Sequence, residues 1–194
     1  MTLNLQKMHS QAATKTRIPE GSHTARFAQI IDVGVQPQTD YQTNKPTDSK
    51  PMILITWELP NETIEVTRED GTTEHLPRWI SKEVKQSTHE KATLQKYIET
   101  FTSGAAEASE LAGLPCMLGV GSTNTGNAKV VSCMKHPVGM EIPDLANAPV
   151  VFDFDDPSEE TFIKFPGWIQ MKIMNAENYT GFADTWVDGP DEAA

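Results

Sequence analysis

The sequence predicts a mostly β fold: a five-stranded Greek-key barrel of the OB type with one helix between its third and fourth strands. We expect an irregular acidic C-terminal extension with a short helix to follow the barrel. Three observations predict this class. Two strand patterns and a turn-linked third lead into a single amphipathic helix, a glycine-tipped hairpin comes next, and the last quarter of the chain is acidic. At 194 residues, the chain is long enough for one sizeable domain with extensions.

The first two strands are predicted on either side of a long polar segment. Residues 21–35 have the alternation and the apolar run of a long, bent strand, whereas residues 36–50 are turn-forming and long for a passive connection. The second strand is PMILITWEL, residues 51–59, and Pro60 is expected to end it. Its period of two assigns alternate side chains to opposite faces: Met52, Leu54, Thr56 and Glu58 against Ile53, Ile55 and Trp57.

The third strand, the helix and the closing hairpin follow in that order. Residues 63–80 predict a hairpin around an Asp-Gly turn, and its second half is the third strand. Ser87 is the expected N-cap of the helix, with Glu90 completing a capping box. The residues at helical spacing on the core-facing side are Leu94, Tyr97, Ile98 and Phe101. The last two strands are predicted at residues 116–120 and 129–134.

Charge and composition divide the chain into parts. Residues 140–194 carry 12 acidic and 2 basic side chains, although the whole chain has a net charge of only −11. We expect a mobile arm over residues 1–19, the barrel over 20–139, an extension that packs on the barrel or a partner over 140–176, and an acidic flexible tail over 177–194. The tail is compatible with a solvated, solubilising role and with a role in binding partners or masking the core.

The search for catalytic chemistry is negative. The histidines are isolated, and no His/Cys/Asp/Glu set has the spacing of metal ligands. The glycine-rich segment 119–126 lacks the Gly-Lys-Ser/Thr of a phosphate-binding loop and is better explained as a hairpin tip. We therefore expect no enzymatic activity, no metal and no cofactor. The N-terminus has no apolar signal region and no apolar run approaches a membrane span, so we expect a cytoplasmic protein without membrane contact.

One cluster has the composition of a single-strand binding site. Such sites combine aromatic faces, on which bases stack, with cations along the path of the phosphates. In RWISKEVK, Trp79 is accompanied by three cations: Arg78, Lys82 and Lys85. Trp57, in contrast, alternates with core residues and is expected to pack rather than to stack on bases.

A second group of candidate contacts lies near the N-terminal half of the predicted barrel. Tyr41 is close in sequence to Lys45 and Lys50, in the polar segment that joins the first two strands. Loops at this position are among those with which an OB barrel holds its ligand. Arg26 is a further candidate for a phosphate contact, although a surface arginine is usually just solvated.

Four segments resemble a known family: IPEGSHTARFAQIIDVG, RWISKEVKQSTHEKATLQKYIETF, LAGLPCMLGV and FPGWIQMKIMNAENY. They are similar to segments of tailed-phage single-stranded-DNA-binding proteins with an OB fold. The resemblance implies DNA binding in phage DNA replication or recombination, in the cytoplasm of the host cell. It also implies that the acidic tail recruits other replication or recombination proteins. The chain departs from bacterial single-strand-binding tails at its end, because Asp191-Glu-Ala-Ala194 replaces a terminal Pro-Phe.

Two hypotheses follow from the sequence. The first is a non-enzymatic protein that binds single-stranded DNA with little sequence preference, by base stacking and phosphate neutralisation. The alternative is a protein–protein interaction or structural module that does not bind nucleic acid, which the net negative charge favours.

Overall fold

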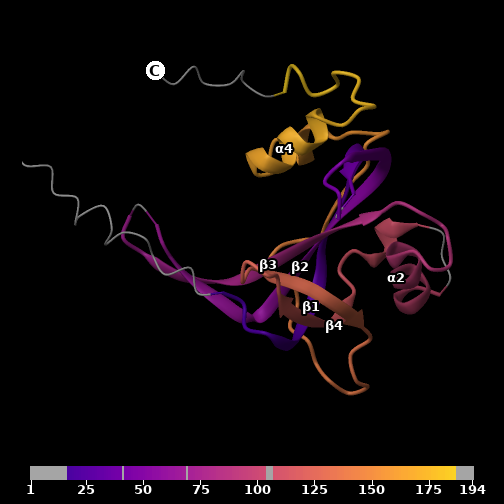
Figure 1. The fold of residues 1–194 in the computed structure, drawn as a ribbon. Helices are drawn as coiled ribbons and strands as arrows, with labels where there is room; N and C mark the ends of the chain where they lie inside the picture. Colours follow the sequence, from indigo (N-terminus) through magenta and orange to yellow (C-terminus); the bar gives the residue numbers. More distant parts are fainter. Residues whose placement is uncertain (1–16, 41, 69, 104–106, 187–194) are drawn as a thin grey trace, which may run out of the picture.

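The computed structural model describes residues 17–40, 42–68, 70–103 and 107–186, and these form a mostly β architecture, as predicted (Figure 1). The strands are β1 (Gly21–Thr39), β2 (Pro46–Thr67), β3 (Thr73–Lys85), β4 (Pro115–Ser122), β5 (Ala128–Met134) and β6 (Val150–Phe152). The helical elements are α2 (Thr93–Phe101), a 3-10 turn η1 (Ala108–Leu111), α3 (Glu159–Phe162) and α4 (Gly167–Met174). Within these ranges, every helix is too short or too polar to cross a lipid bilayer.

The strands form one sheet in the order β3-β2-β1-β4-β5, and all neighbours in this path are antiparallel. The long strand β1 serves both halves of the sheet, since residues 21–26 pair with β4 and the rest pairs with β2. β6 adds to β1 in parallel. The terminal strands of the path, β3 and β5, are not hydrogen-bonded to each other, so the sheet is open. The helix α2 lies between the third and fourth strands, as predicted.

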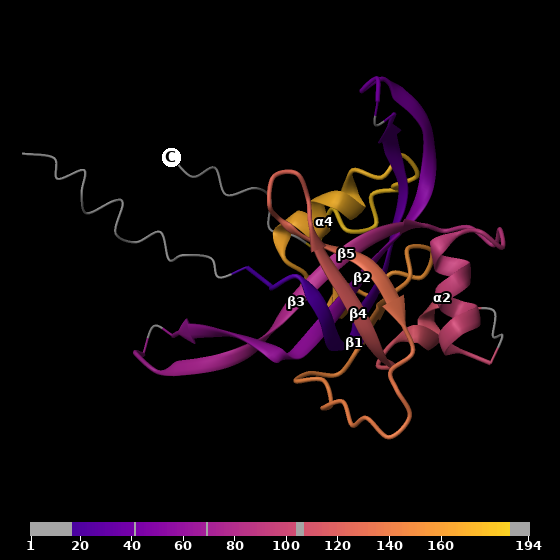
Figure 2. The same ribbon diagram turned by 60° about the horizontal axis from the view of Figure 1, so that its bottom comes forward.

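The first two strands are longer than the sequence predicts. Most of the segment 36–50, predicted as a loop, continues β1 and β2. β2 also runs past Pro60, which was expected to end it. The pairing of β2 with β3 is interrupted between Leu59 and Thr63, and this irregularity accommodates a residue that has no amide hydrogen to donate. Figure 2 shows the resulting β1–β2 and β2–β3 hairpins projecting in different directions.

The predicted start of the helix is wrong, but its buried side is confirmed. α2 begins at Thr93, and its N-cap position, Ala92, makes no side-chain capping bond. Ser87 lies before the helix, where its Oγ accepts the amide hydrogen of His89 at 3.3 Å. The side of α2 that faces the sheet consists of Leu94, Tyr97 and Ile98, with Phe101 partly buried beside them.

Two apolar cores lie on opposite faces of β1–β3. The inner face packs against α2, η1, β4 and β5, and the alternation of PMILITWEL is confirmed, because its inner residues Ile53, Ile55 and Trp57 all belong to this core. Phe27 packs against Trp57 with 5.4 Å between ring centroids. The outer face packs against the C-terminal segment and contributes Ile31, Val33, Met52 and Leu54.

The C-terminal segment is more ordered than its composition predicts. Stretches expected to be irregular contain β6 and α3, while α4 is the short helix expected in this extension. Residues 177–186, assigned from sequence to a flexible tail, contribute partly buried side chains to the outer core: Tyr179, Phe182 and Trp186. Gly34 makes the close approach possible, since it has φ +73° and an added Cβ would lie 2.6 Å from the Phe154 ring.

Candidate ligand-binding groove on the outer face of the sheet

The outer face of the sheet is apolar at one end and polar at the other. At the apolar end, Ile31 pairs with Leu54 beneath the C-terminal helices. The next outward-facing rows contain polar residues. Gln29 of β1 lies opposite Thr56 of β2, whose Oγ1 is 2.9 Å from the hydroxyl of Ser81 on β3. Beyond this row, Glu58 of β2 lies opposite Trp79 of β3. The C-terminal segment therefore has an apolar surface to cover at one end only.

Two residues of the sheet hold the loop that covers the polar end of its outer face. Arg26 donates to the carbonyl oxygens of Gly113, Ile142 and Pro143 at 3.0, 2.9 and 2.8 Å, and its Nη2 lies 3.0 Å from Asp144 Oδ1. Its strand partner, Glu58, accepts the amide hydrogen of Ala146 at 2.8 Å through Oε1. These charge-assisted bonds hold residues 142–146 over the sheet.

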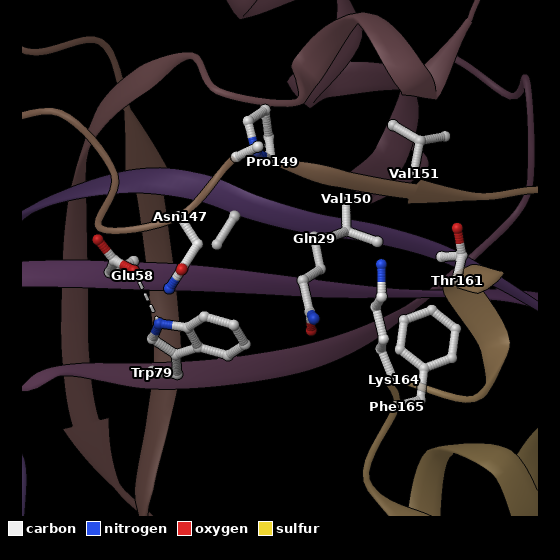
Figure 3. Close-up of a pocket in the computed structure, with 12 residues that line it drawn as sticks. Gln29, Glu58, Trp79, Asn147, Pro149, Val150, Val151, Thr161, Lys164 and Phe165 are labelled. Atoms are coloured by element: carbon white, nitrogen blue, oxygen red, sulfur yellow. Dashed lines mark hydrogen bonds between the residues drawn. The ribbon is translucent and has the colours of Figure 1, made fainter.

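The result is a groove of about 560 Å³ between the sheet and the C-terminal segment. Figure 3 shows its lining. Gln29, Glu58 and Trp79 come from the sheet, and residues 147–151 and the α3 region, including Lys164, form the other side. Glu58 Oε2 accepts a hydrogen bond from Trp79 Nε1 at 2.9 Å, which fixes the indole at one end of the groove. Cavities of this size are typical of ligand-binding pockets.

A second, more apolar hollow of about 380 Å³ continues from the first. It shares Glu58, Trp79 and Asn147 with the groove and reaches the base of the β2–β3 hairpin. Its other lining residues include Ile18, Ile64, Leu76 and Arg78. The Trp79 side chain is 45% exposed and lies between the two hollows, so a ligand that ran through both would pass over its ring.

Most of the buried polar residues lie on the outer face of the sheet, in or beside the groove. In the part of the chain that the structure describes, four polar or charged residues are buried: Gln29, Gln36, Thr56 and Glu58. Three of the four lie in the two polar rows of the outer face. Burial of a polar group without a compensating hydrogen bond costs roughly 1–3 kcal/mol, and Thr56 and Glu58 avoid this cost through their hydrogen bonds.

The structure separates the cations of the predicted RWISKEVK cluster. Side chains alternate along β3, so Trp79 shares the outer face with Lys85, while Arg78 and Lys82 flank the core residue Ile80 on the inner face. Arg78 still reaches the edge of the second hollow, and its Nε donates to the Thr63 carbonyl at 3.2 Å. The residues of RWISKEVK are therefore adjacent in the sequence but do not form one patch on the surface.

The other predicted residues lie away from the groove or are engaged elsewhere. Tyr41 is outside the described residues. Lys45 and Lys50 belong to the β1–β2 hairpin, and Lys50 is eight residues from Glu58 along β2, or roughly 26 Å. Arg26 was predicted to contact phosphate. In the structure, its guanidinium donates hydrogen bonds to three backbone carbonyl oxygens, two of which belong to the loop over the groove.

Sequence analysis missed Gln29, Glu58 and Lys164. A signal for the first two exists, because PMILITWEL has apolar residues on both of its faces, which indicates a strand that is covered on both sides. A carboxylate or an amide on such covered strands must be buried, and buried polar groups need partners. Lys164 is separated from the sheet residues by more than 80 positions, and no local pattern connects them.

No cluster of His, Cys, Asp and Glu among the described residues has the arrangement of a metal site. The nearest approach is a hollow of about 300 Å³ beside β6 that contains Asp32, Asp153 and Asp155. Burial raises the pKa of Asp32, and the two neighbouring carboxylates raise that pKa further. Comparison of the chain with protein families, curated proteins and solved structures gives no match.

Proposed function

We propose that this protein binds single-stranded DNA, and that the strand runs along the outer face of β1–β3 past Trp79. The observation that carries the proposal is the position of this ring: it is half-exposed, it is held by Glu58, and it lines two neighbouring hollows. Sequence-tolerant single-strand binding requires such a platform, because every base has a π-face.

The strand connections support the same reading. β1 pairs with both β2 and β4, and α2 lies between β3 and β4, which is the arrangement of an OB barrel that is open between β3 and β5. OB folds bind oligonucleotides on the face that includes strands 2 and 3. Trp79 and Glu58 lie on these two strands. These connections support the proposal that the fold is of the OB type and that the resemblance to phage single-strand-binding proteins reflects a common function.

One cation borders each end of the proposed path. Arg78 borders the hollow near the β2–β3 hairpin, and Lys164 borders the groove. Lys164 is 67% exposed and pairs with Glu160 at 2.8 Å, and ion pairs that are this exposed to solvent are weak. A phosphate can replace the glutamate at little cost. Few cations line the path, so the slope of log K against log salt should be shallow, about −0.7 for each phosphate neutralised.

The test is a fluorescence titration of labelled oligo-dT at low and moderate salt. Trp79→Ala should weaken binding by about 1–3 kcal/mol, the value of one stacked base. Trp79→Phe retains a stacking ring and should weaken it less. The control is Trp168→Ala, which removes from α4 an indole that is 54% exposed and lies outside both hollows. If Trp79→Ala and Trp168→Ala bind oligo-dT equally well, with intact circular dichroism spectra, the path past Trp79 is refuted.

One observation favours the alternative, a protein–protein interaction module. The β2–β3 hairpin exposes the apolar side chains of Ile64, Val66 and Leu76 on one face, and strips of this kind often bind proteins. The titration distinguishes the two functions. A parent protein that fails to bind oligo-dT even at low salt would favour the interaction module.

A further inference from the structure

Gln29 differs from every other buried polar residue that the structure describes. Thr56 pairs with Ser81, and Glu58 accepts two hydrogen bonds. Gln36, on the same strand as Gln29, donates to the carbonyl oxygens of Val33 and Lys172. Gln29 is only 6% exposed, yet its amide has no hydrogen-bond partner among the described residues.

The Gln29 amide points into the groove. Figure 3 shows its terminal atoms in the space between the Trp79 ring and the Lys164 ammonium group. A glutamine amide offers two N–H donors and one carbonyl acceptor side by side. The Gln29 amide is not among the fully buried polar atoms that lack a partner, so it is accessible from the groove, and a ligand in the groove can pair with its donors and its acceptor.

We infer that the groove is a nucleobase subsite in which one base of the bound strand stacks on Trp79 and presents its hydrogen-bonding edge to Gln29. This inference rests on the proposed function, because its ligand is a base of single-stranded DNA. The Watson–Crick edge of each base carries a donor or an acceptor that a glutamine amide can complement. Stacking and edge contact therefore act at one place on the strand, while Lys164 neutralises an adjacent phosphate.

The chemistry of thymine gives a sharp test. Its edge offers O4 as an acceptor and N3–H as a donor, and methylation at N3 removes the donor while the ring remains. The probes are labelled oligo-dT and an oligonucleotide of N3-methylthymidine with the same length. The variants are Gln29→Met, which retains the side-chain length without hydrogen-bonding groups, and the control Gln38→Met on the same strand.

The parent protein should bind oligo-dT about fivefold more tightly than the methylated strand, the factor of about one neutral hydrogen bond. Gln29→Met should bind oligo-dT about fivefold more weakly than the parent and should no longer distinguish the two strands. Gln38→Met should behave as the parent does. This comparison is a double-mutant cycle in which the second change is made on the ligand, so general effects of methylation cancel.

A second readout separates this role from a structural one. Gln29→Met removes an unpartnered buried amide, so its thermal midpoint without DNA should equal or exceed that of the parent. A lower midpoint together with weaker binding to both strands would overturn the subsite, because the glutamine would then support the fold. If Gln29→Met does not fold, Gln29→Leu is compared in the same way. If neither variant folds, the glutamine supports the fold and the subsite is overturned.

The outcomes also distinguish the subsite from the proposed function. If the parent binds oligo-dT and Gln29→Met discriminates between the two strands as the parent does, the subsite is refuted and single-strand binding stands. If the parent binds neither strand, the proposed function is refuted and the subsite with it.

Discussion

The two faces of β1–β3 are built from the same strands but differ in what they bury. The inner face is apolar along its length, from Ile53 to Leu59 on β2, and the elements between β3 and the end of β5 cover it. The outer face is apolar only around Leu54 and becomes polar at Thr56 and Glu58. A sheet that needed only stability would gain from apolar residues on both faces. The polar end of the outer face is therefore where we place the function.

Substitution of the two tryptophans on adjacent strands should give the largest difference in stability between the two faces. Trp57 is 0% exposed and packs against Phe27 and Tyr97, whereas Trp79 on the opposite face is 45% exposed. Trp57→Ala should lower the free energy of unfolding by about 3–5 kcal/mol. Trp79→Ala removes one hydrogen bond to the Glu58 carboxylate and little packing, so its loss should be smaller, about 1.5–3 kcal/mol. Urea unfolding followed by circular dichroism measures both.

A reversal of this order would contradict the assignment of the faces. If Trp57→Ala does not fold, the milder Trp57→Phe still allows the comparison, because it retains an aromatic ring in the core. In binding, the order of the two variants should be inverted. Trp57→Phe should retain oligo-dT affinity, while Trp79→Ala should weaken it by about 1–3 kcal/mol.

The next test concerns the C-terminal segment that covers the outer face of the sheet. Ile173 of α4 is 0% exposed and packs in the outer core, while Met171 on the same helix is 63% exposed. Ile173→Ala should destabilise the protein by about 2–4 kcal/mol, and Met171→Ala should have an effect within about 0.5 kcal/mol. Urea unfolding monitored by both far-UV circular dichroism and tryptophan fluorescence makes the measurement.

The same experiment shows whether the two cores unfold together. Coincident transitions for both spectroscopic probes would mean that the C-terminal segment is an integral layer of the fold. Separate transitions would mean that the outer face can be uncovered while the inner core remains folded. In that case, Ile173→Ala should shift the first transition to a lower urea concentration. An Ile173→Ala effect as small as that of Met171→Ala would contradict the packing of α4 on the sheet.

Element order and the alternation of β2 could be predicted from the sequence because both depend on local patterns. The period of two in PMILITWEL assigned Trp57 to the core, and the helical spacing around Tyr97 found the buried side of α2. The start of that helix could not be found in the same way, because Ser87 forms a local turn instead of a cap. The side-chain oxygen of a serine can accept a hydrogen bond in a local turn or in a helix cap, and tertiary packing determines which of the two forms.

The candidate groove could be predicted only in part. Trp79 was found because aromatic and basic residues are adjacent in the sequence. Its partners come from β1, β2 and the segment after residue 140, and they meet only through strand register and the loop that Arg26 holds. An arginine has the same charge whether it binds phosphate or three backbone carbonyls, so composition alone could not separate the two roles of Arg26.

The smallest expected effect concerns the acidic hollow where the inner core meets β6. Asp32 is half-buried there, and burial, reinforced by Asp153 and Asp155, raises its pKa above the ordinary value of 3.8. Protonation is then easier in the folded state than in the unfolded one. The charge of Asp32 consequently costs nothing below pH 3.8, and its cost grows as the pH rises through the folded-state pKa.

Asp32→Asn should therefore stabilise the protein at neutral pH by a few tenths of a kcal/mol, and the gain should disappear near pH 3.8. The amide oxygen can still accept the Gly34 amide hydrogen that Asp32 Oδ1 accepts at 2.8 Å, so the local turn is retained. Thermal melts of both proteins between pH 3.5 and 7.5, with the exposed Asp48→Asn as control, make the measurement. A gain that grew as the pH fell would show that Asp32 is stabilised in its charged form, and the hollow would then be a favourable carboxylate environment instead of a repulsive one.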